Sequence, residues 1–352
     1  MKRAILSLTL LLPLRARAQQ DVVAPPATEP DRAAAVTPGP AKPFKVAPLE
    51  EGMLENGVKL ALMELHRMPL VSVSIILPLG GSALDARGKS GLAPLVAALM
   101  TEGSGAMNGR RFAEALDDIG ATIGVSVSQD ALTVAVFAAK ENIDKALGLA
   151  AQAIRSPSLP QADFDRIKAE MIAGLQQEKG DPGGQAERKL ALRLYPDHPY
   201  GAAADEASVA ALTLDDAKGF ARDRLSPRGA VVAAGGDLAL PEFEAVVAKH
   251  FGSWRPRTRA HPPALPAESA DPAVQAGLAI DVIDMPGSLQ SAIRAGQRGV
   301  TRDDPDYMPL TVMNFLLGRA PILSRLDHNL RETHGWAYGA RSDLNALKLA
   351  GA

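Results

Sequence analysis

The sequence predicts an α+β fold with an antiparallel or mixed sheet. Apolar residues alternate along short segments that follow one another in the chain, which is typical of strands joined by hairpins. Longer segments repeat apolar residues at helical spacing, and they come in groups, so βαβ crossovers do not dominate the order. With 47% hydrophobic and 22% charged residues, the chain has the composition of a globular protein with a large core.

The first part of the chain predicts the order β-β-α-α-β-β-α-α, followed later by β-α. Residues 58–65 and 71–79 are expected to form an opening pair of strands that ends at Gly80-Gly81. Ser90 is the expected N-cap of a buried helix over residues 91–100. Further helices are predicted over residues 108–119, 140–155, 160–179 and 241–251, a hairpin over 121–128 and 132–138, and a strand over 229–234.

The last part of the sequence predicts a weak copy of the same order. Strands are expected over residues 279–283, 290–295 and 337–343, and helices over 306–317 and 322–332. A domain that matches the first would need about twice this length. The second domain is therefore expected to be incomplete at Ala352 and to expose sheet edge and core.

Two proline-rich stretches set the predicted domain boundaries. Residues 19–48 read as an extended linker, and residues 257–272 as a linker between domains. They frame a first domain over residues 49–256 and a second over residues 273–352.

The first eighteen residues predict a signal peptide. Lys2 and Arg3 give a positive start, residues 4–14 form an apolar run too short to span a bilayer, and Ala-Arg-Ala at 16–18 is a cleavage site. We therefore expect a periplasmic or secreted protein, without a membrane span in the later sequence. The chain has no cysteine, which excludes disulfides, thiolate nucleophiles and cysteine-bound zinc. Its net charge of −2 and lack of a basic run give no sign of nucleic-acid binding.

Several collinear segments carry a resemblance to a known family. They include the stretch at 53–100, YPDHPYG at 195–201, VIDMPGSLQSAIRAG at 282–296 and SRLDHNLRETHGWAYGARS at 324–342. By these segments the chain resembles the pitrilysin/insulinase class of zinc peptidases over residues 49–352. The resemblance implies two homologous α/β sandwich domains with mostly antiparallel sheets that close around a large chamber.

Active members of this class carry the zinc motif H-x-x-E-H on the first helix and a further glutamate on a later helix. The resemblance places the two histidine positions at Pro94 and Ala98, the general base at Ala97, and the later glutamate at Gly174. None of these side chains has a lone pair to offer a metal. The chain is therefore expected to hold no zinc and to be inactive alone.

The rest of the sequence offers no replacement for these ligands. Glu170 and Glu178 flank the later glutamate position, but a lone glutamate does not hold zinc. Of the six histidines, only His328 and His334 lie close in sequence, at i and i+6, which does not put them on a common helix face.

The resemblance also assigns a positive role to Arg331 and Tyr338. In this class an arginine and a tyrosine at this spacing contact the substrate backbone and stabilise the tetrahedral oxyanion. The plainer alternative is that Arg331 pairs with Glu332 while Tyr338 packs at a strand edge. One departure lies nearby, because GRAPILSRL at 318–326 replaces a glycine-rich segment whose backbone would approach the substrate closely.

The sequence thus predicts a zinc-less subunit that pairs, as a heterodimer, with a zinc-bearing homologue and a peptide substrate. The partner would supply zinc and general base, and this chain half of the chamber. Two other functions stay open: a peptide-binding or scaffold module without proteolysis, and an autonomous metallopeptidase with an unrecognised site. A decayed or truncated relic is a further alternative.

Overall fold

A computed structural model describes residues 39–40, 43, 46–196, 198–257, 278–320 and 322–352. The predicted signal peptide lies outside the described residues, as do most of the two predicted linkers. All elements below belong to one compact unit, Ala47–Ala352. In the described part of the chain, no helix combines the length and the apolar character needed to cross a membrane.

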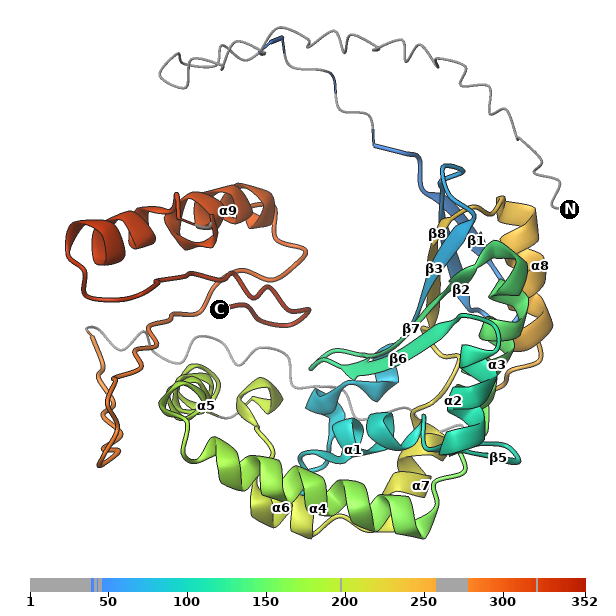
Figure 1. Ribbon diagram of the computed structural model, residues 1–352, viewed down its shortest axis with the longest axis horizontal. Coiled ribbons are helices and arrows are strands. Elements are labelled where there is room, and N and C mark those ends of the chain that lie inside the picture. Colours follow the sequence, from blue (N-terminus) through green and yellow to red (C-terminus); the bar gives the residue numbers. More distant parts are fainter. Residues whose placement is uncertain (1–38, 41–42, 44–45, 197, 258–277, 321) are drawn as a thin grey trace, which may run out of the picture. The chain divides into compact units, whose positions relative to one another are not determined.

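A six-stranded sheet forms the centre of the first part of this unit (Figure 1). Its strands are β1 (Glu50–Met53), β2 (Lys59–Glu64), β3 (Leu70–Leu77), β6 (Thr122–Val127), β7 (Leu132–Ala139) and β8 (Val231–Gly236). Their order in space is β1-β2-β8-β3-β7-β6, and every neighbouring pair is antiparallel except β2 and β8. A separate two-stranded ribbon joins β4 (Gly103–Ser104) and β5 (Met107–Asn108). The predicted α+β class with a mostly antiparallel sheet is confirmed.

The prediction that the two opening strands form a pair is wrong. β2 and β3 both exist, but β8 lies between them, parallel to β2 and antiparallel to β3. Alternation in a sequence shows which face of a strand is buried and says nothing of which strand lies beside it. The short connection over residues 65–69 therefore bridges across an intervening strand.

Eight helices accompany the sheet in this first part of the described chain. They are α1 (Leu92–Leu99), α2 (Gly109–Asp117), α3 (Ile143–Arg155), α4 (Gln161–Glu178), α5 (Pro182–Leu194), α6 (Glu206–Ala210), α7 (Leu214–Asp223) and α8 (Leu240–Phe251). α3 and α8 pack against each other and against one face of the sheet (Figure 1). The predicted helices are present, and their ends differ from the expected ones by no more than three residues.

The core lies between the sheet and these helices. Val71, Val73 and Ile75 of β3 are fully buried, as the alternation predicted, whereas Ser72 points to the opposite, exposed face. Burial of each such side chain contributes about 1.5–3 kcal/mol to folding. The regular alternation fixes the register, because a slip by one residue would expose this whole row.

The described residues of 278–352 form helices but no sheet. The helical parts are α9 (Tyr307–Asn314) and two π-helical turns, η5 (Phe315–Arg319) and η6 (Asp327–Thr333). The strands predicted over 279–283, 290–295 and 337–343 are wrong. A strand persists only when its backbone groups find a neighbour, and the described residues of this part form only isolated bridges at Gly299, Ala346 and Gly351.

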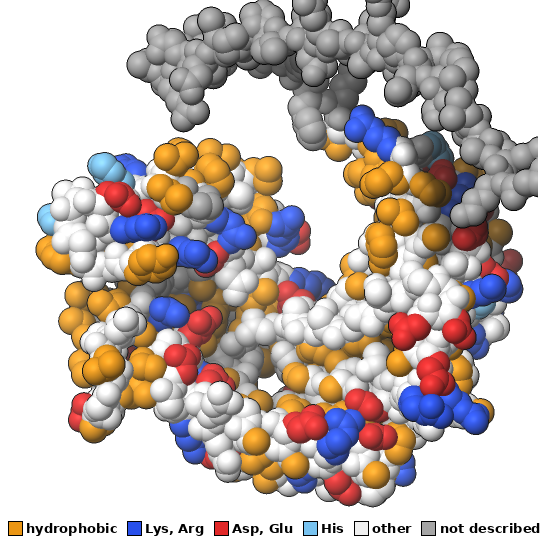
Figure 2. Space-filling view, in the orientation of Figure 1, with side chains coloured by type: hydrophobic (Ala, Val, Ile, Leu, Met, Phe, Trp, Pro, Cys, Tyr) orange, Lys and Arg blue, Asp and Glu red, His pale blue; other side chains and the backbone are white. Residues whose placement is uncertain are grey.

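Apolar side chains of this second part stay at the surface as a result. Met308 and Val312 of α9 are 65% and 60% exposed, and Leu316 of η5 is 59% exposed. Figure 2 shows hydrophobic side chains gathered over this helical part. In the first part of the chain, the sheet covers side chains of the same kind.

Candidate functional site

Asp85 holds the beginning of α1, the helix that carries the predicted zinc-motif positions. One carboxylate oxygen of Asp85 accepts hydrogen bonds from the backbone N–H groups of Gly91 and Ala93, at 3.2 Å each. The other oxygen accepts from Arg224 at 3.3 Å, and Asp85 is nearly fully buried. Burial is the largest influence on the pKa of Asp85 and raises it, while these donors act in the opposite direction.

The predicted N-cap at Ser90 is wrong. The N-cap residue is Gly91, which has a φ of +99° and no side chain to accept a hydrogen bond. Glycine adopts this left-handed conformation without steric cost. A carboxylate six residues upstream of Gly91 supplies the cap instead, so a search for a local N-cap could not find it.

The motif positions on α1 differ in their exposure. Pro94 and Ala98, at i and i+4, are the two exposed residues of α1, whereas Ala97 at the general-base position is buried. α1 also packs against α4, which carries Gly174. Gly174 is exposed, and a Cβ atom built on it would meet no atom within 4 Å.

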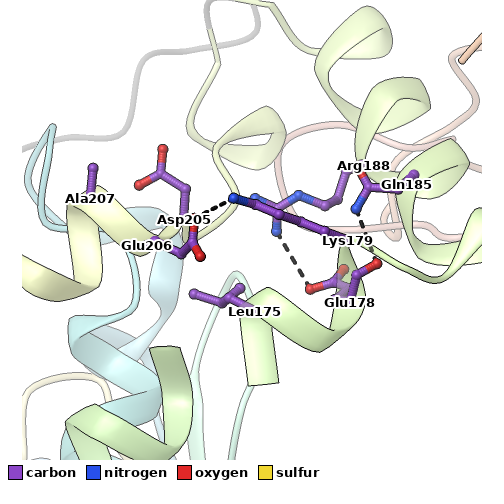
Figure 3. A pocket seen from close by; sticks show the side chains of 8 residues that line it. All are labelled: Leu175, Glu178, Lys179, Gln185, Arg188, Asp205, Glu206 and Ala207. Carbon is purple, nitrogen blue, oxygen red and sulfur yellow. Dashed lines mark hydrogen bonds and ion pairs between the residues drawn. The ribbon is translucent and has the colours of Figure 1, made fainter. Parts of the chain in front are cut away.

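The two glutamates beside Gly174 are engaged in ion pairs. Glu170 accepts from Arg166 at 3.1 Å, on the surface of α4. Glu178 lies 3.8 Å from Arg188 and lines a cavity of about 310 Å³ between the end of α4, the start of α5 and α6 (Figure 3). The other charged side chains of this cavity include Lys179, which pairs with Glu206. Its cations are neutralised by its own carboxylates.

The histidines do not assemble a metal centre in the described part of the chain. No group of three or more His, Asp or Glu side chains there is placed to hold a metal ion. His198 is buried and accepts a hydrogen bond from the N–H of Tyr200, and His250 contacts Asp144 at 2.9 Å. His334 stacks on Trp336. His261 lies outside the described residues.

Arg331 and Tyr338 come together, although the sequence separates them by seven positions. The guanidinium carbon of Arg331 lies 5.1 Å from the ring centre of Tyr338, in a cation–π contact. Arg331 also pairs with Glu332 at 3.3 Å, as the plainer alternative expected. Tyr338, however, packs at no strand edge and is 91% exposed. Tyr338 is therefore presented to solvent, with the guanidinium of the partly exposed Arg331 against its ring.

Asp327 fixes the segment that carries Tyr338. One of its carboxylate oxygens accepts from the N–H of Ala340 at 3.0 Å, and the other accepts from the N–H of Ile322 at 3.2 Å. The N–H of Ala340 is the largest influence on the pKa of Asp327 and lowers it. A single carboxylate thus ties both flanks of η6 together.

This arrangement predicts that acid releases the segment around Tyr338. Because the pKa of Asp327 is lower in the folded chain, its contribution is present above the unfolded value of about 3.9 and is lost as the pH falls through the folded pKa. Hydrogen exchange of the Ala340 amide should accelerate below that pH. Asp327→Asn should show fast exchange already at neutral pH, and an amide that stays protected in this variant would contradict the assignment.

Sequence reasoning missed Asp85, Asp327 and the stacking of His334 on Trp336. Their roles depend on partners that the fold brings close, such as Arg224 for Asp85 and Ala340 for Asp327. The only available signal was a charged residue type at a position expected to be buried. Such a residue is expected to have a partner, but the sequence does not identify which one.

The family matches define the class of this chain as peptidase-like, and the predicted ligand and base positions at Pro94, Ala97, Ala98 and Gly174 carry no metal-binding side chain. The sequence matches the insulinase family, peptidase family M16, over residues 61–196 and the peptidase M16 inactive domain over residues 211–352. The chain belongs to this M16 family, as a member without the H-x-x-E-H motif.

Three similar proteins illustrate the relationship. The non-peptidase homolog YmxG of Helicobacter pylori is 28% identical over 181 residues, which cover 51% of this chain and 42% of YmxG. An uncharacterized zinc protease of Mycobacterium leprae is 24% identical over 301 residues, 85% of this chain and 66% of that protein. The crystal structure of a peptidase M16 inactive domain from Pseudomonas fluorescens superposes with a TM-score of 0.71 and 25% identity, covering 86% of this chain and 72% of that one. The chain thus spans less than two thirds of the length of either sequence relative.

Proposed function

We propose that this chain is the zinc-less subunit of a two-subunit peptidase and lends Arg331 and Tyr338 to a zinc-bearing homologue. The observation that carries the proposal is the exposed contact between these two side chains, at 5.1 Å, in a chain whose zinc positions are Pro94, Ala98 and Gly174. The chain thus offers donors for an oxyanion, whereas its predicted zinc-motif positions offer neither a metal ligand nor a base.

Chemistry supports this division between two subunits. A peptidase site needs a metal-bound water to attack the carbonyl and donors to stabilise the resulting negative charge. Arginine is permanently charged and tyrosine is a directed O–H donor, so both fit the second task. We propose that the complex works in the periplasm or outside the cell, because residues 1–18 have the pattern of a signal peptide.

The test is peptide hydrolysis by this chain alone and in a mixture with a zinc-bearing homologue encoded by the same genome. We expect no hydrolysis by the chain alone, hydrolysis by the mixture, and a roughly ten- to hundred-fold loss with Arg331→Ala, since a hydrogen bond to a charged group is removed. Arg325→Ala, an exposed arginine of the same segment, is the matched control and should not change the rate.

Each contrary outcome points to one of the other functions. A mixture that stays inactive while the chain binds peptides would favour a peptide-binding or scaffold module. The similarity to a protein named a non-peptidase homolog supports this second candidate. Metal-dependent hydrolysis by the chain alone would establish an autonomous peptidase and overturn the proposal.

A further inference from the structure

An aromatic pair lies directly beside Arg331 and Tyr338. The rings of His334 and Trp336 are stacked, with centroids 4.2 Å apart and planes only 13° from parallel. Trp336 nevertheless remains 74% exposed. Since His334 covers one face of the indole, the opposite face is open to solvent.

The backbone of this aromatic pair is fixed by the end of η6. The N–H groups of His334 and Gly335 donate to the carbonyls of Asn329 and Arg331, at 3.2 Å and 3.0 Å. Gly335 has a φ of +62°, a left-handed conformation that ends the helical turn. The N–H of Trp336 then donates back to the carbonyl of Leu330 at 2.9 Å. The backbone that carries the two rings therefore loses little conformational freedom when a ligand binds.

The open indole face lies within reach of whatever Arg331 and Tyr338 contact. Trp336 and Tyr338 are two residues apart, so their Cα atoms are separated by at most about 7 Å. A bound peptide advances about 3.3 Å per residue. A side chain within about two residues of the contacted peptide bond can therefore meet the indole.

We propose that Trp336, backed by His334, is a specificity-determining shelf for an aromatic side chain of the bound peptide. The inference rests on the proposed function of Arg331 and Tyr338. The open face of one indole has the size of one stacked aromatic side chain.

Affinity measurements with the full chain test this specificity. Three synthetic peptides are compared that differ only in one central residue, which is Phe, Ala or Lys. We expect the Phe peptide to bind about three- to ten-fold more tightly than the Ala peptide, the size of one aromatic stacking contact. Trp336→Ala should reduce this ratio to about one, and Trp336→Phe should retain most of it. Leu289→Ala, a fully exposed apolar side chain elsewhere, is the control and should leave the ratio as it is.

Fluorescence gives a second readout that is independent of affinity. The chain has two tryptophans, and Trp254 is buried whereas Trp336 is exposed. Iodide therefore quenches mainly Trp336, and a saturating Phe peptide should protect it more than the Ala peptide does.

The variants separate failure of this inference from failure of the proposed function. Arg331→Ala should weaken all three peptides alike. If it does, and Trp336→Ala still prefers the Phe peptide, the shelf is wrong and the proposed function stands. If Arg331→Ala changes nothing, the proposed peptide contact is wrong as well. A chain that binds none of the three peptides would overturn both.

Discussion

The triple variant Pro94→His, Ala98→His and Gly174→Glu is expected to bind stoichiometric zinc. Pro94 and Ala98 face outward at i and i+4 of α1, and α4 with Gly174 packs against that helix. The open space beyond Gly174 leaves room for a carboxylate. Two imidazoles and one carboxylate are the three protein ligands of a catalytic zinc site with one open position.

Zinc content after dialysis measures this gain, and substitution with cobalt reports tetrahedral coordination in its absorption. The matched control replaces Gly174→Glu by Ala173→Glu, which is also exposed on α4 but points about 100° away around the helix. This control should lose the zinc. A triple variant that folds normally and stays free of zinc would show that these three positions are not the remnant of a zinc site. Ala97, at the predicted general-base position, is unchanged in the triple variant. The variant should therefore bind metal without gaining a general base.

Asp85→Ala is expected to destabilise the first part of the chain by about 3–5 kcal/mol. The side chains of Asp85 and Arg224 are only 3% and 18% exposed, so the substitution leaves a buried guanidinium without its carboxylate. It also removes the acceptor for the N–H groups of Gly91 and Ala93 at the start of α1. Denaturant unfolding monitored by circular dichroism measures the loss.

Two further variants serve as controls for this result. Glu114→Ala breaks the surface pair with Arg110, whose side chains are 55% and 78% exposed, and should cost no more than about 0.5 kcal/mol. The double variant Asp85→Ala and Arg224→Met removes the stranded charge and should recover part of the stability. Equal losses in Asp85→Ala and Glu114→Ala would mean that burial of the Asp85 pair is unimportant.

Local patterns predicted the helices and strands of the first part well, because the type of each element depends mainly on its own residues. The alternation in β3 and the helical spacing in α3 are properties of single segments, and both elements formed. The neighbour of β2 depends on a segment about 170 residues later, which no local pattern encodes. The strands expected beyond residue 278 failed for the same reason, since a strand exists only with its partner.

The candidate site was also predicted only in part. Pro94, Ala97, Ala98 and Gly174 were assigned by resemblance, and that assignment stays a prediction; Pro94, Ala98 and Gly174 are exposed, whereas Ala97 is buried. The resemblance also paired Arg331 with Tyr338, which lie in contact, but their role as substrate contacts stays a prediction. The predicted domain boundaries and the export of the chain likewise stay predictions.

The insertion of β8 between β2 and β3 has a consequence for how the chain folds. Translation produces β2 and β3 early, but their shared neighbour begins only at Val231, after α3 to α7 have emerged. Until then both strands present unpaired backbone, and contacts so distant in sequence form slowly. During translation, the two halves of the central sheet therefore stay unjoined for a long interval. Their exposed strand edges make the nascent chain prone to aggregate, so a chaperone would bind it most usefully at this stage.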